Sequence, residues 1–225
     1  MLSDPDVLVI GGGATGVGIA RDLALRGIEP LVVDRDGFCS GASGRSHGLL
    51  HSGARYADSD PDGAAECLAE ARVLKRIAGA CVADTGGLFV SLSGDDSAYF
   101  EEKREACRAV GIPVETLDPA EARRTVPELA ADAERAMRVP DGVVYPSRLI
   151  AANALDAGTH GAELRPHAPV ESISVTDGDV VAVELGGTAG TTVTPDFVVN
   201  AAGAWAGRVA ELAGVPVEMA PTRGV

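Results

Sequence analysis

Apolar runs and glycine-rich turns alternate at the start of the chain. Residues Val7 to Ile10 form a continuous apolar run, which is typical of a parallel strand buried on both faces. Gly11 to Gly16 then lead into a segment with apolar residues every three or four positions, which predicts a helix. A second apolar run, Leu31 to Val33, ends at Asp34. This order of strand, glycine-rich turn, helix and strand predicts the opening of a doubly wound α/β fold.

The pattern changes twice in the middle of the chain. Residues 39–57 have neither helical nor strand periodicity and are rich in Gly, Ser, Arg and His. A long irregular segment of this kind in a compact domain is usually functional. A helix is predicted from Pro61, and from about residue 85 the pattern indicates a strand at Leu88 to Leu92 and two further helices. We expect residues 85–145 to form an inserted, solvent-facing layer on the substrate side.

The last third of the chain returns to a helix and then to strands. A helix is predicted from Ser147 to about Gly161, and three β-rich runs within residues 170–194 predict a β-meander. Phe197 to Val199 form a further apolar run that leads into Asn200-Ala201-Ala202-Gly203. The chain therefore contains a second passage from a strand through a glycine turn into a helix.

Composition excludes several classes of protein. The chain has 225 residues, of which 46% are hydrophobic, so it can bury a sizeable core. No apolar run reaches the roughly 18 residues of a membrane-spanning helix, and no basic segment precedes the apolar start, so a signal peptide is not expected. The formal net charge of -14 argues against a nucleic-acid partner. This acidity, with two lysines, fits either a protein adapted to high salt or an ordinary acidic protein from a GC-rich genome.

The cysteines do not suggest a metal site. Cys39, Cys67, Cys81 and Cys107 are widely spaced and form no CxxC pair. We interpret them as reduced cytosolic thiols.

The first glycine-rich turn predicts a dinucleotide site. Gly11, Gly13 and Gly16 form a GxGxxG pattern directly after a strand and directly before a helix. In such a site the first glycine makes the turn, the second lets the backbone approach a pyrophosphate, and the third allows close packing of helix and strand. The helix N-terminus offers free N–H groups to the phosphates, and Asp34 can accept hydrogen bonds from the ribose hydroxyls.

The glycine pattern does not decide between FAD and NAD. The Gly/Ser/Arg-rich segment from Ser40 to Gly48 favours FAD, because it is long enough to run beside an extended cofactor. The β-meander followed by Asn200 to Gly203 fits the same arrangement. The expected fold class is α/β: a Rossmann-like FAD/NAD(P)-binding fold, a doubly wound sheet with a β-meander and an inserted α+β layer. The expected segments are 1–84 and 146–225 for cofactor binding and 85–145 for the insertion.

Longer stretches carry a more specific resemblance. They are VIGGGATGVGIARDLALRGIEPLVVDRD, SGASGRSHGLLHSGARYA, LKRIAGACVADTGGLFVSL, VPDGVVYPSRL and VVNAAGAWAGRVAELAG. Together they resemble the large catalytic subunits of anaerobic glycerol-3-phosphate dehydrogenases, within the wider D-amino-acid-oxidase-like family of FAD-dependent oxidoreductases. The likeness covers essentially the whole chain. Ser46 departs from it, since Asn is more usual there, and so does Tyr145, where Asp is common.

The resemblance implies oxidation of sn-glycerol 3-phosphate to dihydroxyacetone phosphate, with hydride passing to the flavin N5. His51 is the candidate base, or a hydrogen-bonding partner of the O2 hydroxyl, because an imidazole titrates near neutral pH. Arg55 can bind a phosphate bidentately, and Tyr56 can donate a hydrogen bond to it. The alternatives are a structural histidine, a loop arginine and a packed tyrosine.

The resemblance also implies a set of cofactor contacts and partners. The cofactor-binding residues expected from the fingerprint and the resemblance together are Gly11, Gly13, Ala14, Thr15, Gly16, Asp34, Arg35, Ser43, Arg45, Ser46, Gly48, Leu49, Val170, Ala202 and Gly203. Expected partners are glycerol 3-phosphate, the other subunits of a dehydrogenase complex including an iron–sulfur protein, and membrane quinone indirectly. The expected location is cytoplasmic, at the inner face of the cell membrane through partner subunits.

Two other functions stay open from the sequence. One is an FAD-dependent amine or amino-acid oxidase of the same fold, and the other is a non-catalytic nucleotide-binding fragment. Residues Pro221 to Val225 resemble the start of a strand that leads into a further substrate domain, so we expect the chain to stop before the enzyme is complete.

Overall fold

The structure, a computed structural model, describes residues 4–221 in two compact units. Unit 1 holds the described residues of the segments 1–46 and 146–225, and unit 2 holds residues 47–145. The expected division, with residues 1–84 and 146–225 for cofactor binding and residues 85–145 as an insertion, assigns segments by function and stays a prediction.

Unit 1 is built on a parallel sheet with the strand order β13-β1-β2-β9. Its strands are β1 (Val7–Ile10), β2 (Pro30–Val33), β9 (Glu163–Arg165) and β13 (Phe197–Asn200). The helical elements of this unit are α1 (Ala14–Leu25), η1 (Ala42–Arg45), α5 (Pro146–Thr159), η3 (Gly203–Trp205) and α6 (Ala206–Leu212). An antiparallel meander joins β10 (Val170–Thr176), β11 (Asp179–Leu185) and β12 (Thr191–Val193).

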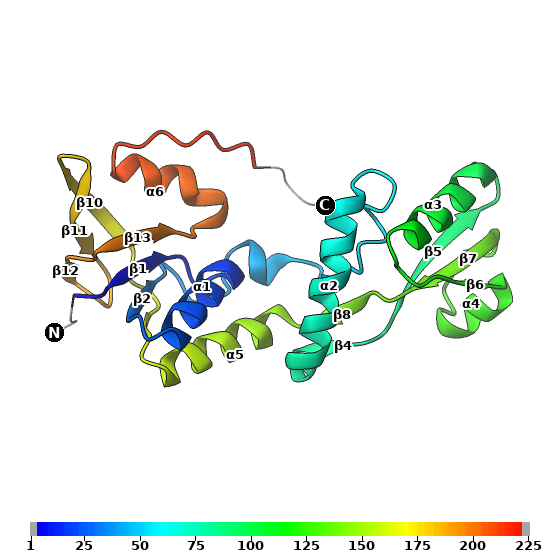
Figure 1. Ribbon diagram of the computed structural model, residues 1–225, viewed down its shortest axis with the longest axis horizontal. Coiled ribbons are helices and arrows are strands. Elements are labelled where there is room, and N and C mark those ends of the chain that lie inside the picture. The colour runs from blue at the N-terminus through cyan, green and yellow to red at the C-terminus, as the bar shows by residue number, and fades with distance from the viewer. Residues whose placement is uncertain (1–3, 222–225) are drawn as a thin grey trace. The chain divides into compact units, whose positions relative to one another are not determined.

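Both faces of the central strands are covered, which explains their continuous apolar sequence. On one face, Val7, Val9 and Val32 pack with Ala20 of α1. On the other face, Leu8, Ile10, Leu31 and Val33 pack with residues of the meander and of α6. Helices α1 and α5 lie against each other (Figure 1). The predicted doubly wound α/β fold with a β-meander is therefore confirmed.

Unit 2 contains two antiparallel sheets, with the strand orders β3-β8-β4 and β5-β7-β6. The strands are β3 (Leu49–Leu50), β4 (Val82–Ala83), β5 (Gly87–Leu92), β6 (Glu115–Leu117), β7 (Ala133–Val139) and β8 (Gly142–Val144). The helical elements are α2 (Pro61–Ile77), η2 (Gly79–Cys81), α3 (Ser97–Ala109) and α4 (Pro119–Thr125). The main core of this unit joins α2, α3, β7 and the loop at Ala54 and Ala57.

Three further expectations from the sequence concern the end of the chain, membrane-spanning helices and the cysteines. The strand expected from Pro221 lies outside the described residues from position 222 onward. None of the helices within residues 4–221 combines the length and apolar character that crossing a bilayer would require. All four cysteines are free thiols.

Candidate active site

Two close backbone approaches fix the glycine-rich turn after β1. Gly11 has a φ of +119°, and a Cβ on it would lie 2.4 Å from the carbonyl oxygen of Ala201, just after β13. A Cβ on Gly16 would lie 1.8 Å from the carbonyl oxygen of Gly11. Both distances are far below van der Waals contact, so a side chain at either position would force the backbone apart. Gly11 and Gly16 therefore hold β1, α1 and the loop after β13 together.

Gly13 is different, because a side chain there would meet another side chain and not the backbone. Within 4 Å, and leaving out its chain neighbours, a Cβ on Gly13 would meet one atom of the described residues, the Ser43 Oγ at 3.1 Å. Gly13 is also the N-cap of α1, and the Ala14 N–H donates to the same Ser43 Oγ over 3.1 Å. The first turn of α1 carries no acidic residue. The positive end of this helix is therefore available to an anion.

Asp34 joins the glycine turn to the loop after β2. Its Oδ2 accepts a hydrogen bond from the Gly12 N–H over 2.7 Å, and its Oδ1 accepts one from the Asp36 N–H over 2.9 Å. Each carboxylate oxygen has a further lone pair, so the half-exposed carboxylate can still accept from ligand hydroxyls. These two bonds fix its orientation at the carboxyl end of β2.

A pocket of about 490 Å³ opens beside these groups in unit 1. It is lined by residues at the ends of β1, β2 and β13, including Ile10, Val33 and Ala201. The sequence-predicted cofactor residues that line it are Gly11, Gly13, Ala14, Thr15, Asp34, Arg35, Ser43, Arg45, Val170, Ala202 and Gly203. The strand order reverses between β1 and β13, and ligands of open α/β sheets bind at such a switch point.

Four predicted cofactor residues do not line this pocket. Gly16 is buried under the turn, and Ser46 is exposed, with its Oγ 3.4 Å from the Ser43 carbonyl oxygen. Gly48 and Leu49 belong to unit 2, where the Gly48 carbonyl accepts from the Val144 N–H and Leu49 pairs with β8. Their contact with a cofactor stays a prediction.

The pocket also contains residues that the sequence prediction missed. They include Ala168 and Pro169 before β10, and Trp205 in η3. The Arg35 guanidinium lies 4.2 Å from the centroid of the Trp205 ring, so a cation–π contact spans one side of the pocket. A signal was present for Trp205, since it directly follows the second glycine turn. Ala168 and Pro169 carried no signal.

These residues fit the adenosine diphosphate half of a dinucleotide. The missing side chain of Gly13, which lines the pocket, and the N-terminus of α1, whose first turn has no acidic residue, suit a pyrophosphate, and the Asp34 carboxylate suits a ribose diol. Arg45, on η1, adds a positive charge to the pocket.

The second group of predicted residues lies on a loop of unit 2 that follows β3. Gly53 has a φ of +91°, and a Cβ on it would lie 2.2 Å from the Ala64 carbonyl oxygen of α2, so the loop runs tightly over that helix. Three aromatic rings lie in series here: the His51 ring lies 6.0 Å from Tyr56 of the same loop and 6.2 Å from His47, which precedes β3, and both pairs are edge to face. The structure therefore brings His51 and Tyr56 together.

His51 is half-buried, and this environment favours its neutral form. Burial lowers the pKa of the His51 imidazole below its ordinary value of 6.5. The charge of Asp141 opposes this effect, while Arg55 and His47 add to it. A neutral imidazole at physiological pH can accept a proton, as a general base must.

The side chains of Arg55 and Tyr56 are exposed, but the backbone beneath them is anchored. The Arg55 carbonyl oxygen accepts a hydrogen bond from the Lys103 Nζ over 3.1 Å. Lys103 is 3% exposed and also forms an ion pair with Asp58. The loop therefore presents two exposed side chains from a fixed backbone, and both have groups that can donate hydrogen bonds to a phosphate.

Comparison with known proteins identifies the family. The family model described as FAD dependent oxidoreductase (DAO) matches residues 6–225. The chain belongs to the family of FAD-dependent oxidoreductases. Its relatives in this family include the A1 subunit of the anaerobic glycerol-3-phosphate dehydrogenase of Haloferax volcanii, which is 51% identical over 100% of this chain and 40% of its own length. The chain thus spans less than half the length of this relative.

Solved structures of FAD-dependent oxidoreductases share the fold. The glycine oxidase of Geobacillus kaustophilus matches with a TM-score of 0.77 and 28% identity, over 95% of this chain and 59% of its own. The glycerol-3-phosphate dehydrogenase of Bacillus halodurans, solved in complex with FAD, matches with a TM-score of 0.68 and 25% identity, over 92% of this chain and 36% of its own. The expected resemblance to this family is confirmed.

Proposed function

We propose that the protein containing this chain oxidises sn-glycerol 3-phosphate to dihydroxyacetone phosphate with FAD as its redox cofactor. The observation that carries the proposal is the loop His51-Ser52-Gly53-Ala54-Arg55-Tyr56, which combines a half-buried imidazole with two exposed phosphate-binding side chains. The identity of 51% to a component of a glycerol-3-phosphate dehydrogenase supports it.

The residues of unit 1 would hold the cofactor. Gly13 and the N-terminus of α1 would bind the pyrophosphate, and Asp34 would accept hydrogen bonds from the adenosine ribose. Ser43 and Arg45 would contact the phosphates from η1. The chemistry that FAD supplies when bound is acceptance of two electrons as a hydride.

The residues of unit 2 would hold the substrate and move its proton. Arg55 and Tyr56 would bind the phosphate, which orients the glycerol carbon chain. The His51 imidazole would remove the proton of the O2 hydroxyl while C2 gives up its hydride, and C2 becomes the ketone carbon. The hydride carries both electrons of the broken C–H bond, so proton and hydride together account for the oxidation.

Partner subunits and location follow from the same proposal. The relative from Haloferax volcanii is named as one subunit of its enzyme, so we propose that this protein also works in a complex. An iron–sulfur subunit would then carry electrons to membrane quinone, with the protein at the inner face of the cell membrane.

An amine or amino-acid oxidase is the second candidate, because the glycine oxidase from Geobacillus kaustophilus shares the fold at 28% identity.

An anaerobic stopped-flow experiment on the FAD-loaded enzyme separates the glycerol-3-phosphate dehydrogenase from the amine or amino-acid oxidase. We expect glycerol 3-phosphate to bleach the flavin and glycerol, glycine and proline to leave it oxidised. Bleaching by glycine or proline alone would contradict the proposal. A chain that binds no added FAD, measured by flavin fluorescence, would favour the third candidate, a non-catalytic fragment.

A further inference from the structure

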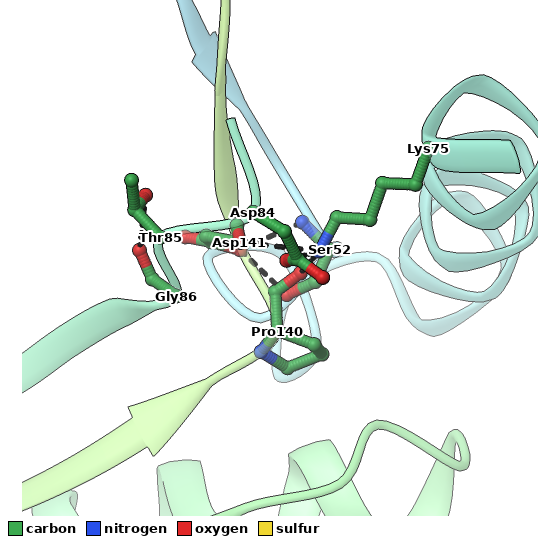
Figure 2. Close-up of polar contacts among 7 residues, drawn as sticks. All are labelled: Ser52, Lys75, Asp84, Thr85, Gly86, Pro140 and Asp141. Carbon is green, nitrogen blue, oxygen red and sulfur yellow. Dashed lines mark hydrogen bonds and ion pairs between the residues drawn. The ribbon is translucent and has the colours of Figure 1, made fainter. Parts of the chain in front are cut away.

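A buried hydrogen-bonded pair lies directly beside His51. Ser52 follows His51 in the chain and is 0% exposed, and Asp141, in the turn between β7 and β8, is 7% exposed. The Asp141 Oδ1 accepts two hydrogen bonds from Ser52, one from its N–H over 2.7 Å and one from its Oγ over 2.6 Å (Figure 2). A residue 89 positions away in sequence thus fixes both the backbone and the side chain of the residue next to His51.

Asp141 is itself held by α2 and β5. The Lys75 Nζ donates to the carbonyl oxygens of Pro140 (2.8 Å) and Asp141 (3.2 Å) and forms an ion pair with Asp84 (Figure 2). On the β5 side, a Cβ on Gly87 would lie 3.0 Å from the Asp141 Oδ2, so the carboxylate fills the space that this glycine leaves. A buried carboxylate is tolerated only where hydrogen bonds and nearby positive charge compensate it, and Ser52 and Lys75 supply both.

The charged and titratable groups around His51 have opposite effects on its protonated form. Asp141 favours the imidazolium, whereas Arg55 and His47 disfavour it, and so does burial. The Tyr56 ring meets His51 edge to face. Asp141 is therefore the acidic member of this set and the one that would compensate the charge that His51 acquires on taking a proton.

We propose that Asp141 is a positioning residue for His51: through Ser52 it sets the orientation of the imidazole, and its charge stabilises the imidazolium formed when the substrate hydroxyl gives up its proton. This role rests on the proposed function, because it concerns His51 as the base. The proposal gives His51 and Asp141 different tasks. His51, on the loop after β3, contacts the substrate. Asp141, in the turn between β7 and β8, acts only through its hydrogen bonds to Ser52 and through its negative charge.

Titration of His51 in the enzyme tests the charge effect without using activity. The enzyme is labelled with [¹³Cε1]-histidine, and the His51 resonance is assigned by its loss in His51→Gln. We expect Asp141→Asn to lower the pKa of His51 by on the order of one unit, since an opposite charge nearby favours the charged form. Asp84→Asn is the matched control, because it removes a carboxylate of the same cluster that does not contact Ser52. An unchanged pKa of His51 in folded Asp141→Asn would overturn the proposal.

Flavin reduction tests the orientation effect. In Asp141→Asn, the pH at which reduction by glycerol 3-phosphate reaches half its plateau should move down with the pKa of His51, with KM little changed. Ser52→Ala keeps the carboxylate and removes one of the two hydrogen bonds, so it should slow reduction roughly 10-fold while the pKa of His51 stays near that of the wild type. Wild-type reduction by Ser52→Ala would refute positioning through Ser52, even if Asp141→Asn does not fold. Wild-type reduction by His51→Gln would instead refute His51 as the base, and failure of glycerol 3-phosphate to reduce the flavin of the wild type would refute the proposed function, while the titration result would stand in both cases.

Discussion

At the scale of single residues, the three glycines of the first turn have separable roles. Gly11 and Gly16 are fixed by backbone atoms 2.4 Å and 1.8 Å from where a Cβ would lie, so they serve the fold. A Cβ on Gly13 would meet the Ser43 Oγ at 3.1 Å and no backbone atom of the described residues within 4 Å, so its stronger constraint would come from a ligand. The sequence pattern predicted these roles because the spacing of GxGxxG reflects both packing and pyrophosphate binding. It could not predict that Trp205 would face Arg35, since that contact depends on the folded sheet.

Substitution of Gly13 should separate folding from cofactor binding. We expect Gly13→Val to fold but to purify without flavin, because the side chain would occupy the space proposed for the pyrophosphate. Gly18→Val is the matched control on α1, since a Cβ on Gly18 meets nothing within 4 Å, and it should keep its flavin. The measurement is the flavin-to-protein absorbance ratio, with circular dichroism to check the fold. A fully flavinated Gly13→Val protein would place the pyrophosphate elsewhere.

Removal of the Asp34 carboxylate should weaken FAD binding without abolishing it. A pair of charge-assisted hydrogen bonds to the ribose contributes roughly 1.5 to 3 kcal/mol, so the Kd of Asp34→Ala should rise about 10- to 150-fold. Asp22→Ala is the control, because Asp22 pairs with Arg26 on the exposed side of α1 and does not line the pocket. Flavin fluorescence titration gives both constants. Equal Kd values for the two variants would end the assignment of Asp34.

At the scale of elements, strands with a continuous apolar run or many β-branched residues were predictable, and a strand rich in charged residues was not. The run Val7–Ile10 is buried on both faces of the sheet, so its sequence predicts its structure. In contrast, β7 has the sequence AERAMRV, which carries three charges and no strand signal. It forms a strand because β5 and β6 pair with it on either side. Arg138 and Glu115 form an ion pair from β7 to β6, which depends on register and so cannot be predicted locally.

The ion pair between Lys103 of α3 and Asp58 of the loop after β3 should make the stability of the fold depend on pH in the acid range. The hydrogen bond from Lys103 lowers the pKa of Asp58 below its ordinary value of 3.8. A carboxyl group with a depressed folded-state pKa contributes stability above its unfolded pKa, and this contribution is lost as the pH falls through the folded value. Lys103→Met should therefore lower the Tm at pH 7, and its difference from the wild type should shrink below about pH 3.8. Arg108→Met, which changes an exposed cation of the same helix, should show a small, pH-independent effect. A Tm difference for Lys103→Met that stays constant down to pH 2 would contradict this account.

At the scale of the whole molecule, each unit carries a different part of the proposed chemistry. Unit 1 holds the pocket proposed for the dinucleotide, at the switch point of its sheet, and unit 2 holds the His51 loop on a core of α2, α3 and β7. The structure divides the chain at residues 46/47 and 145/146. The sequence carries no boundary signal at 46/47, because the Gly/Ser/Arg/His-rich segment 39–57 runs across that position without a change of pattern. The proposed reaction therefore depends on residues from both units.

Kinetic separation of His51 from Arg55 tests that division of labour in the FAD-loaded enzyme. His51→Ala should keep its yellow colour but reduce its flavin about 100- to 10,000-fold more slowly, because it loses general-base assistance. Burial lowers the pKa of His51 below 6.5, so the wild-type rate should be level at neutral pH and fall as the pH drops through that depressed value, when the base becomes protonated. The rate of His51→Ala should show no such decrease at acid pH.

Arg55→Ala should keep the pH dependence of the wild-type rate and mainly raise the substrate concentration needed, since a phosphate contact made equally in the ground and transition states changes KM more than the limiting rate. Stopped-flow bleaching across pH 5 to 8 measures both parameters without partner subunits, and Arg55→Lys serves as the control that keeps the charge but loses the bidentate geometry. If His51→Ala reduced its flavin at the wild-type rate throughout this range, His51 would be structural and another residue would have to accept the proton.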